Sequence, residues 1–173
     1  ALYARGHRLI ADDIVAIDLH DPALPRVIPG YPLFKLWPES VASLGLQPDS
    51  LPRLRDDADK LGWDAHQHFE STPLPLRCIY SLLSAAQIHI QPITHQDVFL
   101  EILRYLYVSR FPGEFSDPQT SARNFRDTAL VARAAAVRYL LRPPDLSSLG
   151  EIAQMIERDL DTLASPDSAS PLS

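Results

Sequence analysis

Glycine, cysteine and long apolar runs are scarce in this 173-residue chain, and each scarcity excludes a kind of protein. The six glycines are isolated, so these residues contain no Gly-x-x-x-x-Gly-Lys-Ser/Thr loop of the kind that cradles nucleotide phosphates. The single cysteine, Cys78, excludes an internal disulfide framework and a cysteine-based zinc cluster. No apolar run approaches the ~20 residues that a membrane-spanning helix needs, so we expect no membrane partner.

Positive charge is also in short supply. Sixteen Lys and Arg stand against 22 Asp and Glu, and the net charge of -6 argues against nucleic acid as a partner. Only two basic residues are lysine, Lys35 and Lys60. The arginine excess favours planar recognition of carboxylate or phosphate, although a codon bias explains it equally well. Methionine occurs once, at Met155, so we expect that Ala1 is not an encoded start.

The patterns that are present predict a mixed α/β protein. Runs rich in β-branched or alternating apolar residues predict strands at residues 14–19, 26–28, 76–83, 87–91 and 136–141. The strands at 76–83 and 87–91 are close enough to form a hairpin. Capping residues and apolar periodicity predict helices at residues 38–44, 98–108 and 120–134, and after Ser148. Residues 48–75, rich in Pro and Asp, are predicted to be a long polar loop.

The character of the sequence changes at residue 94. Residues 1–93 are predicted to be rich in strands and residues 94–164 to be a mainly helical part packed on them. Residues 165–173 are Ser, Pro and Asp with little apolar content, and we expect a disordered tail there. The first residues, 1–5, resemble the last turns of a helix that ends at Gly6.

The first candidate site is the short apolar run at residues 8–11 that ends in Asp12 and Asp13. In nucleotide-binding α/β folds, ligands bind at the carboxyl ends of buried strands, so acids in this position can act on a ligand. One carboxylate can hold Mg²⁺ and another can accept a proton from an attacking hydroxyl. The alternative is that the two acids lie in a solvated turn.

Further candidates are weaker. Residues 29–39 carry Lys35, which could bring a cation toward a phosphate; alternatively, Phe34, Leu36 and Trp37 are core and Lys35 is merely solvated. His66 and His68 have a spacing that can ligate a metal if the segment is extended, but no further ligands are evident. We interpret Cys78, in an apolar run, as a small core residue.

Two segments carry a family resemblance. The run Arg-Gly-His-Arg-Leu-Ile-Ala-Asp-Asp at residues 5–13 is very similar to a stretch of the bacterial HPr serine kinases, where it follows the phosphate loop and its helix. The Pro-Gly-Tyr-Pro turn at residues 29–32, with Lys-Leu-Trp-Pro-Glu at 35–39, resembles a branch of kinase-like relatives. The likeness is strong over residues 1–45, moderate to about residue 83 and general to about residue 160.

The resemblance implies the nucleotide-binding core shared by HPr kinases and phosphoenolpyruvate carboxykinases, with residues 1–93 as its C-terminal part. It implies an ATP-dependent serine kinase that uses Mg²⁺ and phosphorylates a protein or peptide serine in the cytoplasm. By carry-over, Asp12 is the catalytic base, Asp13 a catalytic residue that holds the metal, and Lys35 a contact to phosphate or substrate. The resemblance is also compatible with a homo-oligomer.

Two departures qualify this expectation. Because the phosphate loop is absent from these residues, we expect Ala1 to fall just past it, the core to be incomplete at the N-terminus, and the fragment alone to be inactive. The Arg-Gly-x-Gly loop tied to the family's phosphorylase activity is also missing, which argues against that activity and against HPr as substrate. The alternatives are a non-catalytic interaction module that retains the kinase fold, and a carboxykinase-like enzyme acting on a small oxyacid.

Overall fold

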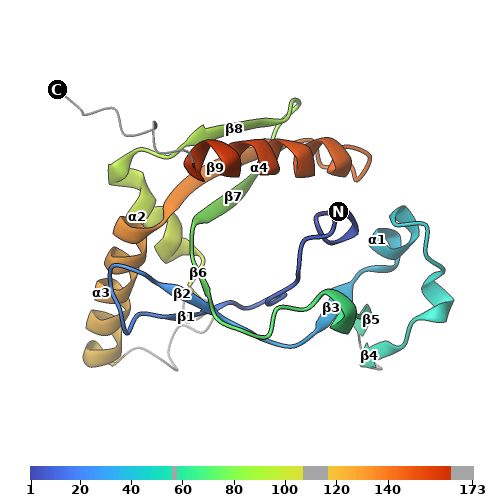
Figure 1. Ribbon diagram of the computed structural model, residues 1–173, viewed down its shortest axis with the longest axis horizontal. Coiled ribbons are helices and arrows are strands. Elements are labelled where there is room, and N and C mark those ends of the chain that lie inside the picture. Colours follow the sequence, from blue (N-terminus) through green and yellow to red (C-terminus); the bar gives the residue numbers. More distant parts are fainter. Residues whose placement is uncertain (56–57, 107–116, 165–173) are drawn as a thin grey trace.

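The computed structural model describes residues 1–55, 58–106 and 117–164, and it confirms the general α/β class. Its strands form three sheets of three strands each among the described residues. One sheet lies next to the long helix α4 (Leu149–Ala164), and another lies beside the short helix α1 (Pro38–Ser43) (Figure 1). None of the described helices is both long and apolar enough to span a lipid bilayer.

The sheet next to α4 contains β7 (Cys78–Ser84), β9 (Ala136–Arg142) and β8 (His89–Pro92), in that order. Strand β9 is central: it pairs in parallel with β7 and antiparallel with β8. The predicted hairpin between the strands at 76–83 and 87–91 is therefore wrong, because each of these strands pairs with β9 instead of with the other. The predicted strand at 136–141 is confirmed, and it joins strands from both sides of residue 94 in one sheet.

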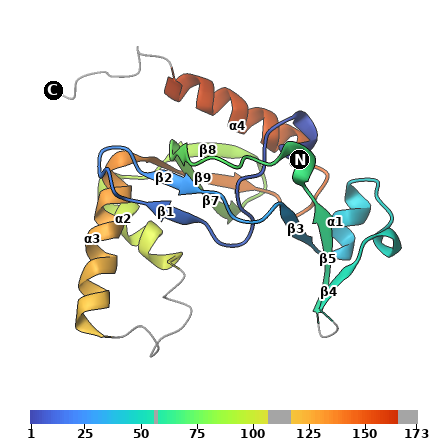
Figure 2. The same ribbon diagram turned by 60° about the horizontal axis from the view of Figure 1, so that its bottom comes forward.

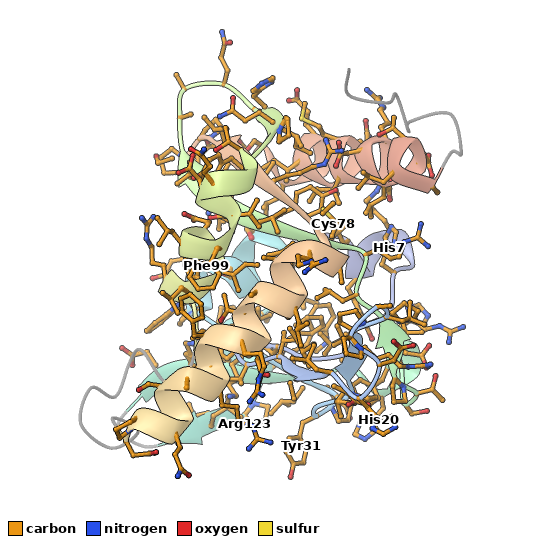
Figure 3. The ribbon with its side chains drawn as sticks, turned by 90° about the vertical axis from the view of Figure 1, so that its left-hand side faces the viewer. His7, His20, Tyr31, Cys78, Phe99 and Arg123 are labelled. Carbon is orange, nitrogen blue, oxygen red and sulfur yellow. The ribbon has the colours of Figure 1, made fainter. Side chains whose placement is uncertain are left out.

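Helices cover this sheet and extend from one end of it. α4 buries Ile152 and Ala153. α2 (His95–Arg104) and α3 (Pro118–Ala134) pack against each other. Phe99 of α2, labelled in Figure 3, lies with its ring centroid 4.6 Å from that of Phe125 in α3. Apolar side chains from the sheet and α2 form a core cluster: Ile93, Val98 and Val137. This end of the molecule is held by burial of apolar surface, the dominant favourable term in folding.

The other two sheets are antiparallel. The first contains β1 (Ala16–Asp18), β2 (Arg26–Ile28) and β6 (Leu74–Pro75). The second contains β3 (Leu33–Leu36), β5 (Ala58–Asp64) and β4 (Arg53–Arg55), and Figure 2 shows it on the side of the molecule opposite α3. The predicted loop at 48–75 is wrong, since β4, β5 and β6 lie within it. Pairing with β3 over four residues overrides the low strand propensity of Asp, Lys and Gly in β5.

Local signals account for most element boundaries. Gly6, at a φ of 95°, ends the 3₁₀-helix Tyr3–Arg5, so the predicted stop is confirmed although the turn is not α-helical. The side chain of Asp117 accepts hydrogen bonds from the backbone of Gln119 and Thr120 and so begins α3. α2 starts at residue 95, three residues before the prediction. The predicted end of that helix at 107–108 and the predicted tail at 165–173 lie outside the described residues.

Glu157 ties the N-terminal segment to α4. Its carboxylate accepts two hydrogen bonds from the Arg5 guanidinium, at 2.9 and 2.6 Å, and lies 2.9 Å from Nε2 of His7. Figure 3 shows His7 below α4. The hydrogen bonds from Arg5 and His7 lower the pKa of Glu157 from its usual 4.5 to about 2. The segment that leads into Asp12 and Asp13 is thereby anchored at its start.

A Glu157→Gln change should therefore lower the melting temperature at neutral pH and lose its effect in acid. The folded-state pKa lies below the unfolded one, so the carboxylate's contribution is complete above pH 4.5 and disappears as pH falls through about 2. Thermal unfolding followed by circular dichroism at several pH values measures this. In an Arg5→Gln, His7→Gln background the same change should have little effect. A pH-independent difference would contradict the ion-pair explanation.

Candidate functional site

The two acids lie in a bend and not at the end of a sheet strand. Of residues 8–11, Leu9 alone forms a bridge, with Phe69, so this apolar run is not a sheet strand that ends at the acids, which is the arrangement on which the candidate depended. The argument from the carboxyl ends of parallel strands does not apply, since the one parallel strand pair among the described elements is β7 with β9. A hydrogen bond from the Gly30 amide to the Ile10 carbonyl, 2.7 Å long, holds the bend against the 29–32 turn.

Asp12 connects this bend to β3. Its Oδ2 accepts a hydrogen bond of 3.0 Å from the backbone N–H of Lys35. This bond engages one oxygen of the Asp12 carboxylate and so fixes the direction in which its other oxygen points. Because β3 is held by β5 across four residue pairs, Asp12 is positioned by a sheet and not by a free loop.

Asp13 binds both lysines of the chain. Its Oδ2 lies 3.3 Å from Nζ of Lys35, and its Oδ1 lies 3.7 Å from Nζ of Lys60. The side chains of Asp13, Lys35 and Lys60 are 42, 44 and 30% exposed, so these ion pairs are open to water. The Lys60 ammonium also lies 5.6 Å from the centre of the Trp37 ring, within the range of a cation–π contact. We call Asp12, Asp13, Lys35, Lys60 and Trp37 the acid–lysine site.

The sequence identified three of these five residues. Asp12, Asp13 and Lys35 are the predicted candidates, and the structure brings them together. Lys60 was missed because it falls in the segment predicted to be a loop; its one signal is that it is the second lysine among sixteen basic residues. Trp37, for which the sequence leaves a core position as the alternative, is 52% exposed.

Mg²⁺ fits this site only if substrate phosphates and waters supply the rest of its ligands. Among the described residues, no group of three or more His, Cys, Asp or Glu side chains could hold a metal ion. Mg²⁺ is usually bound by one or two carboxylates together with substrate phosphates and waters, and the Asp13 carboxylate matches that smaller donor set. Since each Asp13 oxygen faces an ammonium, a metal at Asp13 has to replace at least one of these contacts.

A groove begins at the acid–lysine site. It has a volume of about 720 Å³ and runs from Asp13 between β1, β7 and α2. Its lining is mostly apolar and includes Ile14, Val15 and Leu82. Its lining also includes Glu101, which is buried, accepts a 2.6 Å hydrogen bond from the Ser81 hydroxyl and pairs with Arg104 at 3.1 Å.

The structure does not bring the remaining candidates into this site. His66 and His68 lie in a 3₁₀-helix and not in an extended segment. His66 bonds Asp64 through Nδ1 at 2.5 Å, while the His68 ring packs 5.4 Å from that of Tyr3, so the two histidines have different partners. Cys78 lines the groove, and burial raises the pKa of its thiol, which disfavours the reactive thiolate.

The fold and the site together define a mixed α/β protein with a surface site of two carboxylates and two lysines. Comparisons with protein-family models, with curated proteins and with solved structures found no match to the chain. A function for the chain is therefore proposed from two observations. One is the resemblance carried by residues 5–13 and 29–39, and the other is the geometry of the acid–lysine site.

Proposed function

We propose that this chain carries the catalytic acids of an ATP-dependent serine kinase of the HPr-kinase type. One observation supports the proposal most. The two segments that resemble the family, residues 5–13 and 29–39, meet where Lys35 contacts Asp12 through its backbone and Asp13 through its ammonium. Segments that serve one site are expected to meet in space, although the two lie about 20 residues apart in the sequence.

In the proposed reaction the serine hydroxyl oxygen forms a bond to the γ-phosphorus of ATP, and the bond from that phosphorus to the leaving ADP oxygen breaks. Asp12 accepts the hydroxyl proton through the oxygen that Lys35 does not occupy. Asp13 would hold Mg²⁺, and the bound metal would supply positive charge that neutralises the nucleotide phosphates. Lys35 places a positive charge next to the same carboxylate, so it can contact the transferred phosphoryl group.

The test is transfer of radiolabelled phosphate from ATP in the presence of Mg²⁺. It is run on the protein as its gene encodes it, with a serine-containing protein, a serine peptide library or oxaloacetate as acceptor. Formation of phosphoserine on protein or peptide supports the proposal. Conversion of oxaloacetate without serine transfer indicates the carboxykinase-like alternative. If the protein neither binds ATP nor transfers phosphate, the proposal fails and the interaction module is favoured.

A further inference from the structure

We propose that Lys60 is a second phosphate-binding residue of the acid–lysine site, and that Asp13 withholds both lysines from phosphate until a divalent cation binds its carboxylate. The inference rests on the proposed function for its ligand, a phosphate group bound together with Mg²⁺. In this arrangement the metal and the phosphate each strengthen the binding of the other. The side chains of Asp13, Lys35 and Lys60 cause that dependence.

The sheet places the two lysines on one face. Lys35 in β3 is paired with Gly62 in β5, and Lys60 lies two residues from Gly62 along the same strand. Since side chains alternate between faces with a period of two, Lys60 projects to the same side as Lys35, as its diagonal neighbour. Asp13 reaches this face from the bend and contacts both ammoniums. The convergence therefore follows from strand register as well as from side-chain contact.

Trp37 gives Lys60 a second partner at the site. The residue follows the end of β3 directly, and its ring lies 5.6 Å from the Lys60 ammonium. A cation over an indole ring is attracted by the negative face of the ring. This contact does not depend on Asp13, so it can hold the ammonium near the site after the carboxylate has turned to another ligand.

Charge balance makes phosphate binding depend on the metal. Asp12 and Asp13 carry two negative charges and Lys35 and Lys60 two positive ones, so the site alone offers an anion little net attraction. When Asp13 turns to a divalent cation, the two ammoniums lose their carboxylate partner and the local charge becomes positive. Ion pairs as exposed as these are weak, so the exchange is easy.

Lysine is the appropriate residue for this exchange. Its ammonium is a compact charge with three donors on a flexible stem, and it can rotate from a carboxylate to a phosphate without a planar geometry to satisfy. Arginine supplies the other fourteen basic residues of the chain, yet both lysines occur at Asp13. A codon bias toward arginine does not account for where the two exceptions lie.

The experiment measures the affinity of Mn²⁺, used in place of Mg²⁺ because free Mn²⁺ is visible by electron paramagnetic resonance, with and without methyl phosphate. In the wild type, methyl phosphate should tighten Mn²⁺ binding by a factor in the usual range for coupled sites, about 5–150-fold, and Mn²⁺ should tighten methyl phosphate binding by the same factor. In Lys60→Gln this factor should fall toward one, while Mn²⁺ alone binds as tightly as before or more tightly. Lys60→Arg should retain part of the factor.

Arg53→Gln is the matched control, because Arg53 is a basic residue with an exposed side chain on the next strand, β4. It should change neither affinity nor coupling. In a Trp63→Phe background Trp37 is the one remaining tryptophan, and quenching of its emission by Mn²⁺ locates the metal. Equal coupling in wild type and Lys60→Gln overturns the role of Lys60, and failure of wild type to bind Mn²⁺ overturns the whole inference. Phosphate transfer is not measured, so failure of the kinase proposal would leave a positive result intact.

Discussion

An Asp12→Asn variant is expected to transfer phosphate to serine about 10²–10⁴-fold more slowly than wild type, which is the range that a positioned general base contributes. Asparagine has nearly the shape of aspartate, and its amide oxygen can still accept the backbone N–H of Lys35. The change therefore removes the proton acceptor while preserving the link between the bend and β3. Initial rates with saturating ATP and Mg²⁺ measure the effect.

Two further variants sharpen this test. Asp18→Asn is a matched control, because Asp18 is an exposed aspartate whose side chain also accepts a backbone N–H, that of His20. Its transfer rate should equal that of wild type. Asp13→Asn should lower both transfer and Mn²⁺ affinity, whereas Asp12→Asn should lower transfer alone. Equal rates for Asp12→Asn and wild type would remove Asp12 from the mechanism.

Replacing Leu140 by alanine is expected to lower the free energy of unfolding by about 2–5 kcal/mol, the range observed when a leucine is truncated in a packed core. Leu140 is in β9, the central strand of its sheet, and its side chain is 2% exposed. Truncation would leave a cavity at a position enclosed by strands on both sides, where the backbone cannot collapse freely. Urea denaturation gives the free energy, and an unchanged slope with denaturant shows that the two-state comparison is valid.

Leu82→Ala provides the control within the same sheet. Leu82 is the partner of Leu140 in the parallel pairing of β7 with β9, but its side chain is 54% exposed. The two leucines are the same residue type and are paired in register, but Leu82 lies in the edge strand and the two differ in burial. We expect Leu82→Ala to cost less than about 1 kcal/mol, because little area is removed from water at that position. Similar losses in the free energy of unfolding for the two variants would contradict the difference in burial between the two side chains.

The elements that the sequence predicted well are those with local signals. The helix at residues 38–43 begins with Pro38, whose missing N–H is not needed in a first turn. The helix after Ser148 has apolar residues at helical spacing on one face. The strand at residues 136–142 is an apolar run that ends before two prolines. In each case the boundary depends on residues within a few positions of it.

The errors concern pairing, which depends on distant residues. Strand β5 contains Asp, Lys and Gly, and forms because β3 lies beside it. For the same reason, the sequence predicts only part of the acid–lysine site. Asp12, Asp13 and Lys35 occur in segments with a family resemblance, whereas Lys60 reaches the site through strand register alone. No feature of residues 48–75 by themselves predicts that register.

The central position of β9 has a consequence for how the protein is made. β9 lies about 50 residues after β7 in the chain, yet it occupies the place between β7 and β8. At a synthesis rate of about 5–20 residues per second, the ribosome releases the two outer strands several seconds before the middle one. During that interval neither outer strand has the neighbour with which it pairs in the folded sheet. The central strand β9 is therefore the last of the three strands of this sheet to be synthesised.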